Sequence, residues 1–240
     1  MPPLESEDAA ATPLRVHLTG FGPFRHHAVN ASWEAVRPLD GTALTALTPA
    51  DGAKPPGLPT ARPVELSCSL IPVKYASALS LVPALHARPQ YDLVIHCGVS
   101  GGNRIHLERR ARKFGYEQLD VDGQLAPAAS DTRRGFPQPE WESCPEELVT
   151  NIDTARLCRV AQRRGIEHVA PSDDAGLYLC EFTYYTSLAS ARTQEPQSPT
   201  PVLFVHVPPA DQPYSIEQLT AALRVIIWAA THPGDPGEEE

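Results

Sequence analysis

The stretch that most constrains the fold of this 240-residue chain is a short, nearly continuous apolar run from Asp92 to Cys97. Such a run is typical of a central strand in a parallel sheet, which is buried on both faces. Further strands are predicted over Leu14–Thr19, Val64–Ile71, His168–Ala170 and Pro201–Val207. Segments with helical spacing separate them, and this alternation predicts an α/β fold with a mostly parallel sheet.

Five segments are predicted to be helical. Asn30 or Ser32 can cap a helix that runs to about Leu39, and Ser215-Ile216-Glu217-Gln218 is a capping box that opens a last helix to about Ala230. The other three are Tyr75–His86 with a kink or restart at Pro83, a helix from Asn151 or Asp153 to Arg164, and a helix whose first residues include Cys180. Residues 105–112 fit either a strand or a helix.

We expect one domain over residues 14–231. Residues 1–13 are acidic and rich in proline and alanine, which predicts a disordered lead-in, and residues 232–240 form an acidic tail. Residues 40–63 contain five prolines and indicate a surface insertion. Residues 117–150 are rich in proline and acidic side chains and predict a long loop.

Charge and cysteine content narrow the function classes. A net charge of −9 disfavours nucleic acid or an anionic membrane as the main partner. The five cysteines are odd in number and have no CxxC spacing, which fits a reducing compartment. The first residues lack the pattern of a signal peptide, and no apolar run reaches the ~20 residues of a membrane span. We therefore expect a cytoplasmic protein.

Side chains that can carry chemistry gather where predicted strands end. In parallel sheets, ligands bind at the carboxyl ends of the strands. Those ends carry Gly20–Phe24, a loop with two aromatic side chains that we expect to be exposed, and the glycine loop Gly98–Gly102. They also carry the turn before Cys180, and His206 ahead of a proline pair. We expect a single cleft to hold them all.

One candidate nucleophile at this cleft is Ser100. The segment Gly98–Gly102 matches the G-x-S-x-G elbow after an apolar strand, and Asp174 and His206 follow in the order of a serine hydrolase. The elbow needs a helix packed behind the serine, however, and residues 103–110 offer a poor apolar face for one. A glycine-rich loop that lets backbone approach a ligand explains the same residues.

The other candidate is Cys180. At a helix start it meets free backbone N–H groups and the positive end of the helix dipole, which favour the nucleophilic thiolate. His206 can take and return the proton, while Glu108 can hold the imidazole in the required tautomer. Three nearby carboxylates oppose a thiolate if they lie close, namely those of Asp173, Asp174 and Glu181. Taken singly, these residues also fit a buried cysteine, a structural histidine and a surface charge.

Five rare motifs follow one another along the chain: Thr19-Gly20-Phe21-Gly22-Pro23-Phe24, Gly98-Val99-Ser100-Gly101, Leu107-Glu108, Asp174–Leu188 and Phe204–Pro209. Together they resemble the pyroglutamyl peptidase I family of cysteine peptidases, especially its mammalian branch. The resemblance covers most of residues 14–230, except 40–63 and much of 120–150. It implies removal of an N-terminal pyroglutamyl group from peptides, a three-layer α/β/α sandwich around a twisted sheet, and no metal or cofactor.

The resemblance also implies roles for individual residues. It makes Cys180 the nucleophile, His206 the general acid and base, and Glu108 the residue that orients the histidine, and it speaks against Ser100. The implied pocket residues are Phe21, Phe24, Val99, Tyr178 and Leu179. Pyroglutamate is a small flat lactam with no charge on its blocked nitrogen, so aromatic faces and an apolar wall suit it.

The chain departs from the family pattern at several places. Lys113 stands where relatives carry asparagine, and a cation there is expected to disturb the loop or the polarity of the pocket. Asp173 and the basic run Arg109–Lys113 are further departures. The sequence therefore leaves two functions open: an active peptidase on pyroglutamyl peptides, expected to be a monomer, or a diverged weak or inactive relative that binds peptide ends or proteins.

Three histidines outside the predicted cleft are of a type that can bind metal. His26-His27 lie in the first loop and His106 precedes Glu108 by two residues. Neither arrangement has the four-ligand spacing of a structural zinc site, so no metal is expected.

Overall fold

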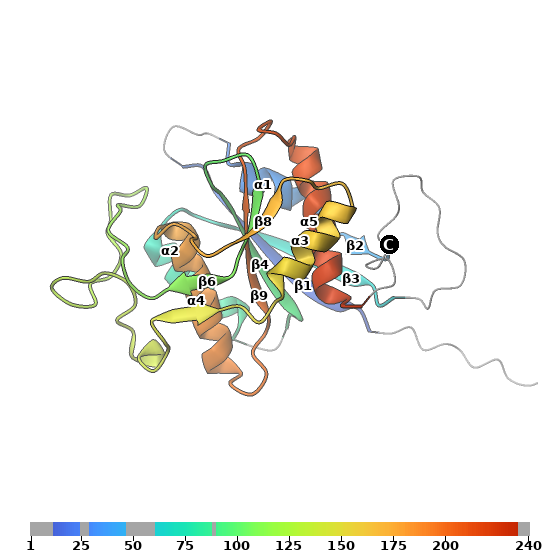
Figure 1. Cartoon of the computed structure of the whole chain (residues 1–240). Coiled ribbons are helices and arrows are strands. Elements are labelled where there is room, and N and C mark those ends of the chain that lie inside the picture. The colour runs from blue at the N-terminus through green and yellow to red at the C-terminus, as the bar shows by residue number, and fades with distance from the viewer. Residues whose placement is uncertain (1–11, 25–28, 47–60, 88–89, 235–240) are drawn as a thin grey trace, which may run out of the picture.

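The computed structural model describes residues 12–24, 29–46, 61–87 and 90–234. Its main sheet has seven strands in the order β2-β3-β1-β4-β9-β5-β8 (Figure 1). Two further strands, β6 and β7, form a small separate sheet. In chain order the strands are β1 (Leu14–Phe21), β2 (Ala43–Leu44), β3 (Val64–Ile71), β4 (Leu93–Val99), β5 (Ile105–Glu108), β6 (Arg110–Arg112), β7 (Glu147–Val149), β8 (Val169–Ser172) and β9 (Val202–Val207).

The main sheet is mostly parallel, as predicted. Strand β1 pairs in parallel with β3 and β4, β4 pairs in parallel with β9, and β5 pairs in parallel with β8. The exceptions are the edge strand β2, which is antiparallel to β3, and the junction between β5 and β9. That junction reverses the direction of the last two strands and decides how the candidate site is assembled.

Helices cover both faces of the sheet and make the three-layer α/β/α sandwich (Figure 1). Helices α1, α3 and α5 pack together over one face, while α2 and α4 pack together over the other. The helices are α1 (Ala31–Val36), α2 (Tyr75–Leu81), α3 (Thr154–Arg163), α4 (Leu179–Gln194) and α5 (Ile216–Thr231), with 3₁₀ turns η1 (Arg37–Leu39), η2 (Pro83–Leu85) and η3 (Pro139–Trp141).

Helix α4 is buried on nearly all sides, which is unusual for a helix on the face of a sheet. Its inner side lies on the sheet, and the segment 117–150 covers its outer side. The Phe136 ring stacks on Phe182 and Tyr185 of α4, with ring centroids 4.2 and 4.6 Å apart. The long loop predicted over 117–150 therefore contains short regular elements, η3 and β7, and buried aromatic side chains.

Local signals located several elements correctly. The Asn30 side chain caps α1, the Ser215 capping box opens α5, and a 3₁₀ turn restarts the chain at Pro83. Residues 105–112 form two strands, β5 and β6, and no helix. Within the range expected to be a surface insertion, Leu44 is buried in β2, while residues 47–60 lie outside the described residues.

Other expectations fall wholly or mostly on undescribed residues, among them the lead-in, the acidic tail and His26-His27. Within the part of the chain that is described, no helix is long and apolar enough to cross a membrane.

Candidate active site

Glu108 and His206 meet across two neighbouring strands. Because β5 and β9 are antiparallel, Glu108 is registered opposite Phe204, two residues before His206. Residues i and i+2 of a strand share a face, so the Glu108 and His206 side chains are diagonal neighbours on the α4 side of the sheet. Glu108 Oε1 lies 2.7 Å from His206 Nδ1, and the two side chains are 1% and 4% exposed.

This contact fixes the imidazole in orientation and tautomer. Glu108 is the last residue of β5, but β5 runs against β9, so the carboxylate reaches the histidine across the sheet and not from a shared strand end. Tyr184 of α4 donates a hydrogen bond of 3.0 Å to the Glu108 carbonyl oxygen, which ties the end of β5 to the same helix that carries Cys180.

Cys180 is the second residue of α4 and is half-buried, as expected for a cysteine at a helix start. Its sulfur lies close enough to the His206 imidazole to act on the pKa of that ring. Since Nδ1 of that ring faces Glu108, Nε2 is the nitrogen left for the sulfur. The structure therefore brings Glu108, His206 and Cys180 into one row, in the order of a carboxylate, an imidazole and a thiol.

Electrostatics in this row favour a charged imidazole. Burial acts to lower the pKa of His206, but the Cys180 thiolate and the Glu108 carboxylate outweigh it and raise that pKa to about 10. An imidazolium beside the sulfur in turn stabilises the thiolate. Burial is the main cause of raised pKa values at the other four cysteines: it raises the pKa of Cys68 to about 12 and that of Cys158 to about 11, and it also raises the pKa values of Cys97 and Cys144.

Gly98 at the carboxyl end of β4 makes room for the sulfur. A Cβ atom at this position would lie 2.7 Å from Cys180 Sγ and 2.9 Å from Cζ of Phe204. Gly98 is also registered beside His206 in the parallel pair of β4 and β9. A glycine in a buried strand often marks such a close approach, which is the signal in the sequence that could have identified this position.

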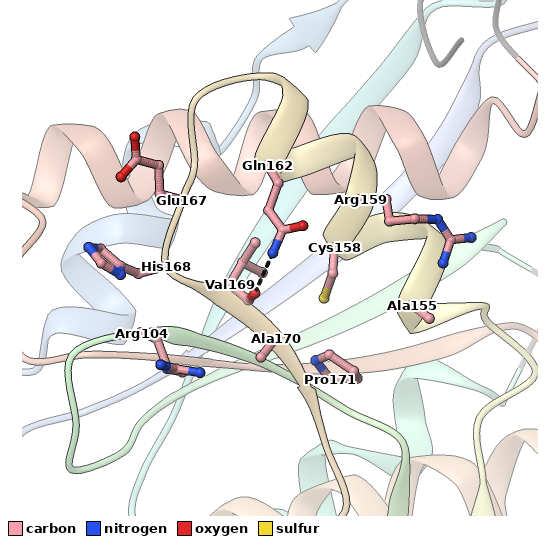
Figure 2. Close-up of a pocket in the computed structure, with 10 residues that line it drawn as sticks. All are labelled: Arg104, Ala155, Cys158, Arg159, Gln162, Glu167, His168, Val169, Ala170 and Pro171. Carbon is pink, nitrogen blue, oxygen red and sulfur yellow. Dashed lines mark hydrogen bonds between the residues drawn. The ribbon is translucent and has the colours of Figure 1, made fainter.

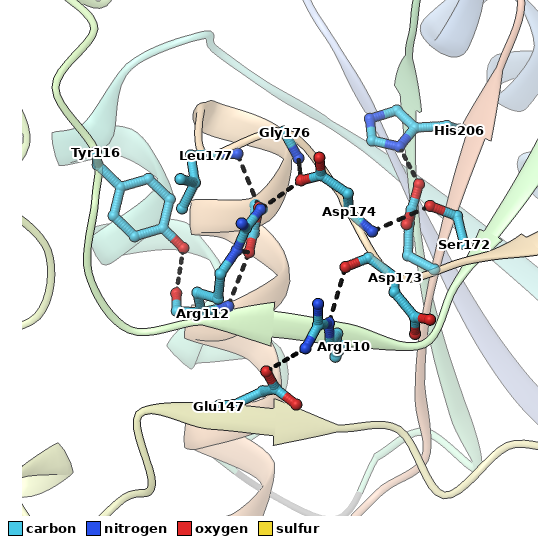
Figure 3. A network of polar contacts seen from close by, with 12 residues as sticks. Arg110, Arg112, Tyr116, Glu147, Ser172, Asp173, Asp174, Gly176, Leu177 and His206 are labelled. Carbon is cyan, nitrogen blue, oxygen red and sulfur yellow. Dashed lines mark hydrogen bonds and ion pairs between the residues drawn. The ribbon is translucent and has the colours of Figure 1, made fainter.

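The three carboxylates that opposed a thiolate are each paired with an arginine. Asp173 pairs with Arg109, and Asp174 pairs with Arg112. Glu181 is bonded to Arg112 through both oxygens, with its side chain 1% exposed. The basic run after Glu108 and the acidic residues on either side of Cys180 are thus two halves of one network (Figure 3).

The expected pocket residues divide into two groups. Phe24 and Tyr178 are half-buried, with ring centroids 5.6 Å apart, and Val99 is half-buried at the end of β4. Phe21 and Leu179 are only 3% and 1% exposed and belong to the core between the sheet and α4. The expectation that Phe21 is exposed is wrong, because β1 extends to this residue, pairs it with Ile71 and packs its ring near Phe204.

The serine elbow is not formed. The chain after Ser100 enters the strand β5, so no helix follows the serine, and Asp174 pairs with Arg112. The Ser100 backbone N–H donates to the Val207 carbonyl oxygen at 3.1 Å, while its hydroxyl is buried without a hydrogen-bond partner among the described residues.

Lys113, one of the departures from the family pattern, is bonded to the backbone of the turn after η3. Its side chain is buried and its Nζ donates to the carbonyl oxygens of Trp141, Glu142 and Cys144 at 2.7, 3.2 and 3.1 Å. The lysine thus holds the turn that follows η3, on the outer side of α4. Its role is to stabilise the covering segment.

A cavity of about 360 Å³ opens elsewhere, between α3 and the edge strand β8 (Figure 2). Arg104, Cys158, Gln162 and His168 are among its lining residues. The Gln162 side chain donates to the Val169 carbonyl oxygen at 3.2 Å. Within the described ranges, no three histidine, cysteine or acidic side chains are grouped so that they could hold a metal ion, His106 included.

The sequence profile of the family described as pyroglutamyl peptidase matches residues 59–221. The chain belongs to the pyroglutamyl peptidase family. It is 38% identical over 214 residues to pyroglutamyl-peptidase 1 of Rattus norvegicus, covering 88% of this chain and 87% of that protein. It is 30% identical over 176 residues to the human pyroglutamyl-peptidase 1-like protein, covering 71% of this chain and 79% of that protein.

Solved structures of the pyroglutamyl peptidase family have the same fold. Pyroglutamyl peptidase I from Bacillus amyloliquefaciens aligns with a TM-score of 0.71 at 24% identity, over 92% of this chain and 97% of that one. Pyrrolidone carboxyl peptidase from Thermococcus litoralis aligns with a TM-score of 0.72 at 18% identity, over 90% and 93% of the two chains. At these identities the likeness establishes the α/β architecture.

Proposed function

We propose that this pyroglutamyl peptidase family member hydrolyses the N-terminal pyroglutamyl group from peptides, with Cys180 as nucleophile, His206 as general acid and base, and Glu108 as the residue that orients the histidine. The observation that carries the proposal is the buried row of a carboxylate, an imidazole and a thiol, with its 2.7 Å contact between Glu108 and His206. Nucleophilic catalysis by cysteine requires such a base, held in turn by a third group.

In the first half of the proposed reaction, the Cys180 thiolate attacks the carbonyl carbon that joins pyroglutamate to the next residue. A C–S bond forms and the carbonyl π electrons move to oxygen. Backbone N–H groups at the start of α4 can stabilise this oxyanion, because the first N–H groups of a helix lack partners within the helix. The C–N bond then breaks, and the His206 imidazolium gives its proton to the leaving amine.

In the second half, water replaces the amine. Neutral His206 takes a proton from the water as its oxygen attacks the thioester carbon, and the C–S bond breaks to return the thiolate. The products are pyroglutamic acid and a peptide shortened by one residue. Glu108 keeps Nε2 of the ring directed at the reacting atoms.

The proposed pocket recognises the lactam by shape and by lack of charge. Phe24, Tyr178 and Val99 offer half-buried aromatic and apolar surface next to the nucleophile. An unblocked amino terminus carries an ammonium group, which would lose its hydration in such surroundings without a carboxylate to pair it. We therefore propose selectivity for pyroglutamyl over free amino termini.

A fluorogenic pyroglutamyl amide tests this proposal, with thiol reductant present and Cys180→Ala as the matched control. We expect release of the fluorophore by the unaltered chain and none above background by the variant. Equal release by both proteins would refute the nucleophile. Absence of release together with calorimetric binding of a pyroglutamyl peptide would instead support the diverged relative that binds peptide ends.

We further propose that residues 14–231 act as one domain, and that the protein works as a cytoplasmic monomer without a metal or cofactor. The two helical layers share one continuous sheet, which supports the single domain. Size-exclusion chromatography with light scattering tests the monomer, and activity that persists in a chelator tests the absence of a metal.

A further inference from the structure

Glu181 is a buried carboxylate immediately after the candidate nucleophile, and each of its oxygens accepts two N–H groups. Oε1 accepts the backbone N–H and the Nε–H of Arg112, at 2.9 and 2.7 Å. Oε2 accepts an Nη2–H of Arg112 and the backbone N–H of Leu177, both at 2.8 Å. The carboxylate is thus fully bonded inside the protein, one residue from Cys180.

Arg112 links this carboxylate to the strand that follows Glu108. It lies in β6, four residues after Glu108, and its carbonyl oxygen accepts the Tyr116 hydroxyl (Figure 3). Its Nη2 also contacts Asp174, whose carboxylate accepts the Gly176 backbone N–H at 3.2 Å. A single guanidinium therefore joins the segment after Glu108 to both sides of the turn that leads into α4.

The turn itself needs support. Gly176 and Leu177 have φ angles of 95° and 44°, and this left-handed region disfavours side chains other than glycine. Leu177 is held there by the hydrogen bond from its backbone N–H to Glu181. The next residue, Tyr178, is the N-cap of α4, so any change at Leu177 moves the start of the helix and the sulfur of Cys180.

We propose that Arg112 and Glu181 form a positioning pair for Cys180, in which Arg112 compensates the charge of Glu181 so that this carboxylate can shape the turn without opposing the thiolate. This inference rests on the proposed function. It assigns neither residue a contact with substrate, and both act through the turn and its charge. A stability role alone is a weak explanation, since buried ion pairs contribute little net stability.

The charged groups around the pair make the prediction specific. Arg112 and the Tyr116 hydroxyl face Glu181, and Asp174 is paired with the same guanidinium. His206 and Cys97 face Cys180, with Glu108 behind the histidine. Loss of the Arg112 charge therefore leaves Glu181 and Asp174 without their arginine at the turn that leads to Cys180, while Arg109 remains paired with Asp173.

The test compares Arg112→Gln, Glu181→Gln and the double variant with the unaltered chain. The control is Arg133→Gln, which breaks an exposed arginine–glutamate pair with Glu146 in the covering segment. Two curves are measured against pH: kcat/KM on a pyroglutamyl amide, and the rate of Cys180 alkylation by iodoacetamide, read by peptide mass. Alkylation needs no turnover, so it reports on the pair even if the proposed function fails.

We expect Arg112→Gln to move the alkylation midpoint up by about one pH unit, because two like charges are uncovered. The double variant removes one of them and should move the midpoint back toward that of the unaltered chain. Arg133→Gln should change neither curve. If Arg112→Gln does not fold, Arg112→Lys and the double variant provide the test. Arg112→Lys retains the cation, so its alkylation midpoint should equal that of the unaltered chain.

Two results would overturn the inference. One is an alkylation midpoint that moves by less than about 0.2 pH units in every variant that folds. The other is an equal upward movement in Arg112→Gln and in the double variant. A third result separates the two proposals. If no protein turns over substrate but the alkylation midpoints shift as expected, the proposed function is rejected and the positioning role of Arg112 and Glu181 is supported.

Discussion

Replacement of Gly98 by alanine should disable the site while leaving the fold in place. The added methyl carbon would lie 2.7 Å from Cys180 Sγ, about 0.7 Å inside the 3.4 Å at which ordinary contact begins, and 2.9 Å from Phe204. The sulfur and the ring must therefore move apart by several tenths of an ångström. A misplacement of about 1 Å can cost ~100-fold in rate, which corresponds to about 3 kcal/mol of transition-state stabilisation.

The assay is kcat/KM on a fluorogenic pyroglutamyl amide, together with the thermal midpoint of each protein. Gly101→Ala is the matched control, because a Cβ there meets nothing within 4 Å and the backbone is not left-handed. We expect Gly98→Ala to lose on the order of 100-fold in kcat/KM and Gly101→Ala to stay near the unaltered chain. If the kcat/KM of Gly98→Ala stays within about threefold of that of the unaltered chain, the close approach of Cys180 to β4 is refuted.

Three further predictions concern the rest of the chain. Iodoacetamide near pH 7 should label Cys180 before the other four cysteines, whose pKa values are raised by burial, and equal labelling in the native protein would contradict the imidazolium–thiolate pair. Lys113→Asn should lower the free energy of unfolding by about 1–3 kcal/mol in urea titrations without raising activity, because three carbonyl oxygens lose their donor; a more active protein of unchanged stability would contradict this. Acid should weaken the fold, because burial lowers the pKa of His17 and of His86 from 6.5 to about 4, so the unfolded chain binds more protons and stability is lost as pH falls from 6.5 to 4. Each histidine contributes about 3 kcal/mol to that loss, and His86→Asn should flatten the pH dependence of urea unfolding; an unchanged slope would contradict it.

Elements with local signals could be predicted from the sequence. The apolar run Asp92–Cys97 became the buried strand β4, and the Ser215 capping box opened α5. Cys180 was expected at a helix start because a turn precedes residues of helical spacing, and it is the second residue of α4. These features depend on neighbours within a few residues, which a sequence displays directly.

Features that depend on distant pairing could not be predicted. The direction of β5 is set by its partners β9 and β8, and its four residues carry no sign of that direction. The contact of Glu108 with His206 was expected, but its diagonal geometry across two antiparallel strands was not. The arginines after Glu108 looked like a departure, because the carboxylate partners of Arg109 and Arg112 lie more than sixty residues away. The predicted first strand ended two residues too early, before Phe21, which is the last residue of β1. Because of that error, Phe21 was expected to be exposed in a loop, whereas it is buried in the strand.

The central claim is that Cys180 is the nucleophile of a site that accepts the pyroglutamyl ring. A pyroglutamyl chloromethyl ketone tests both halves at once, because it carries the ring and alkylates a thiolate placed beside it. Mass mapping should find a single adduct on Cys180, slowed by excess pyroglutamyl peptide and absent from Cys180→Ala. An adduct on another cysteine, or labelling of Cys180 that the peptide does not slow, would contradict the account.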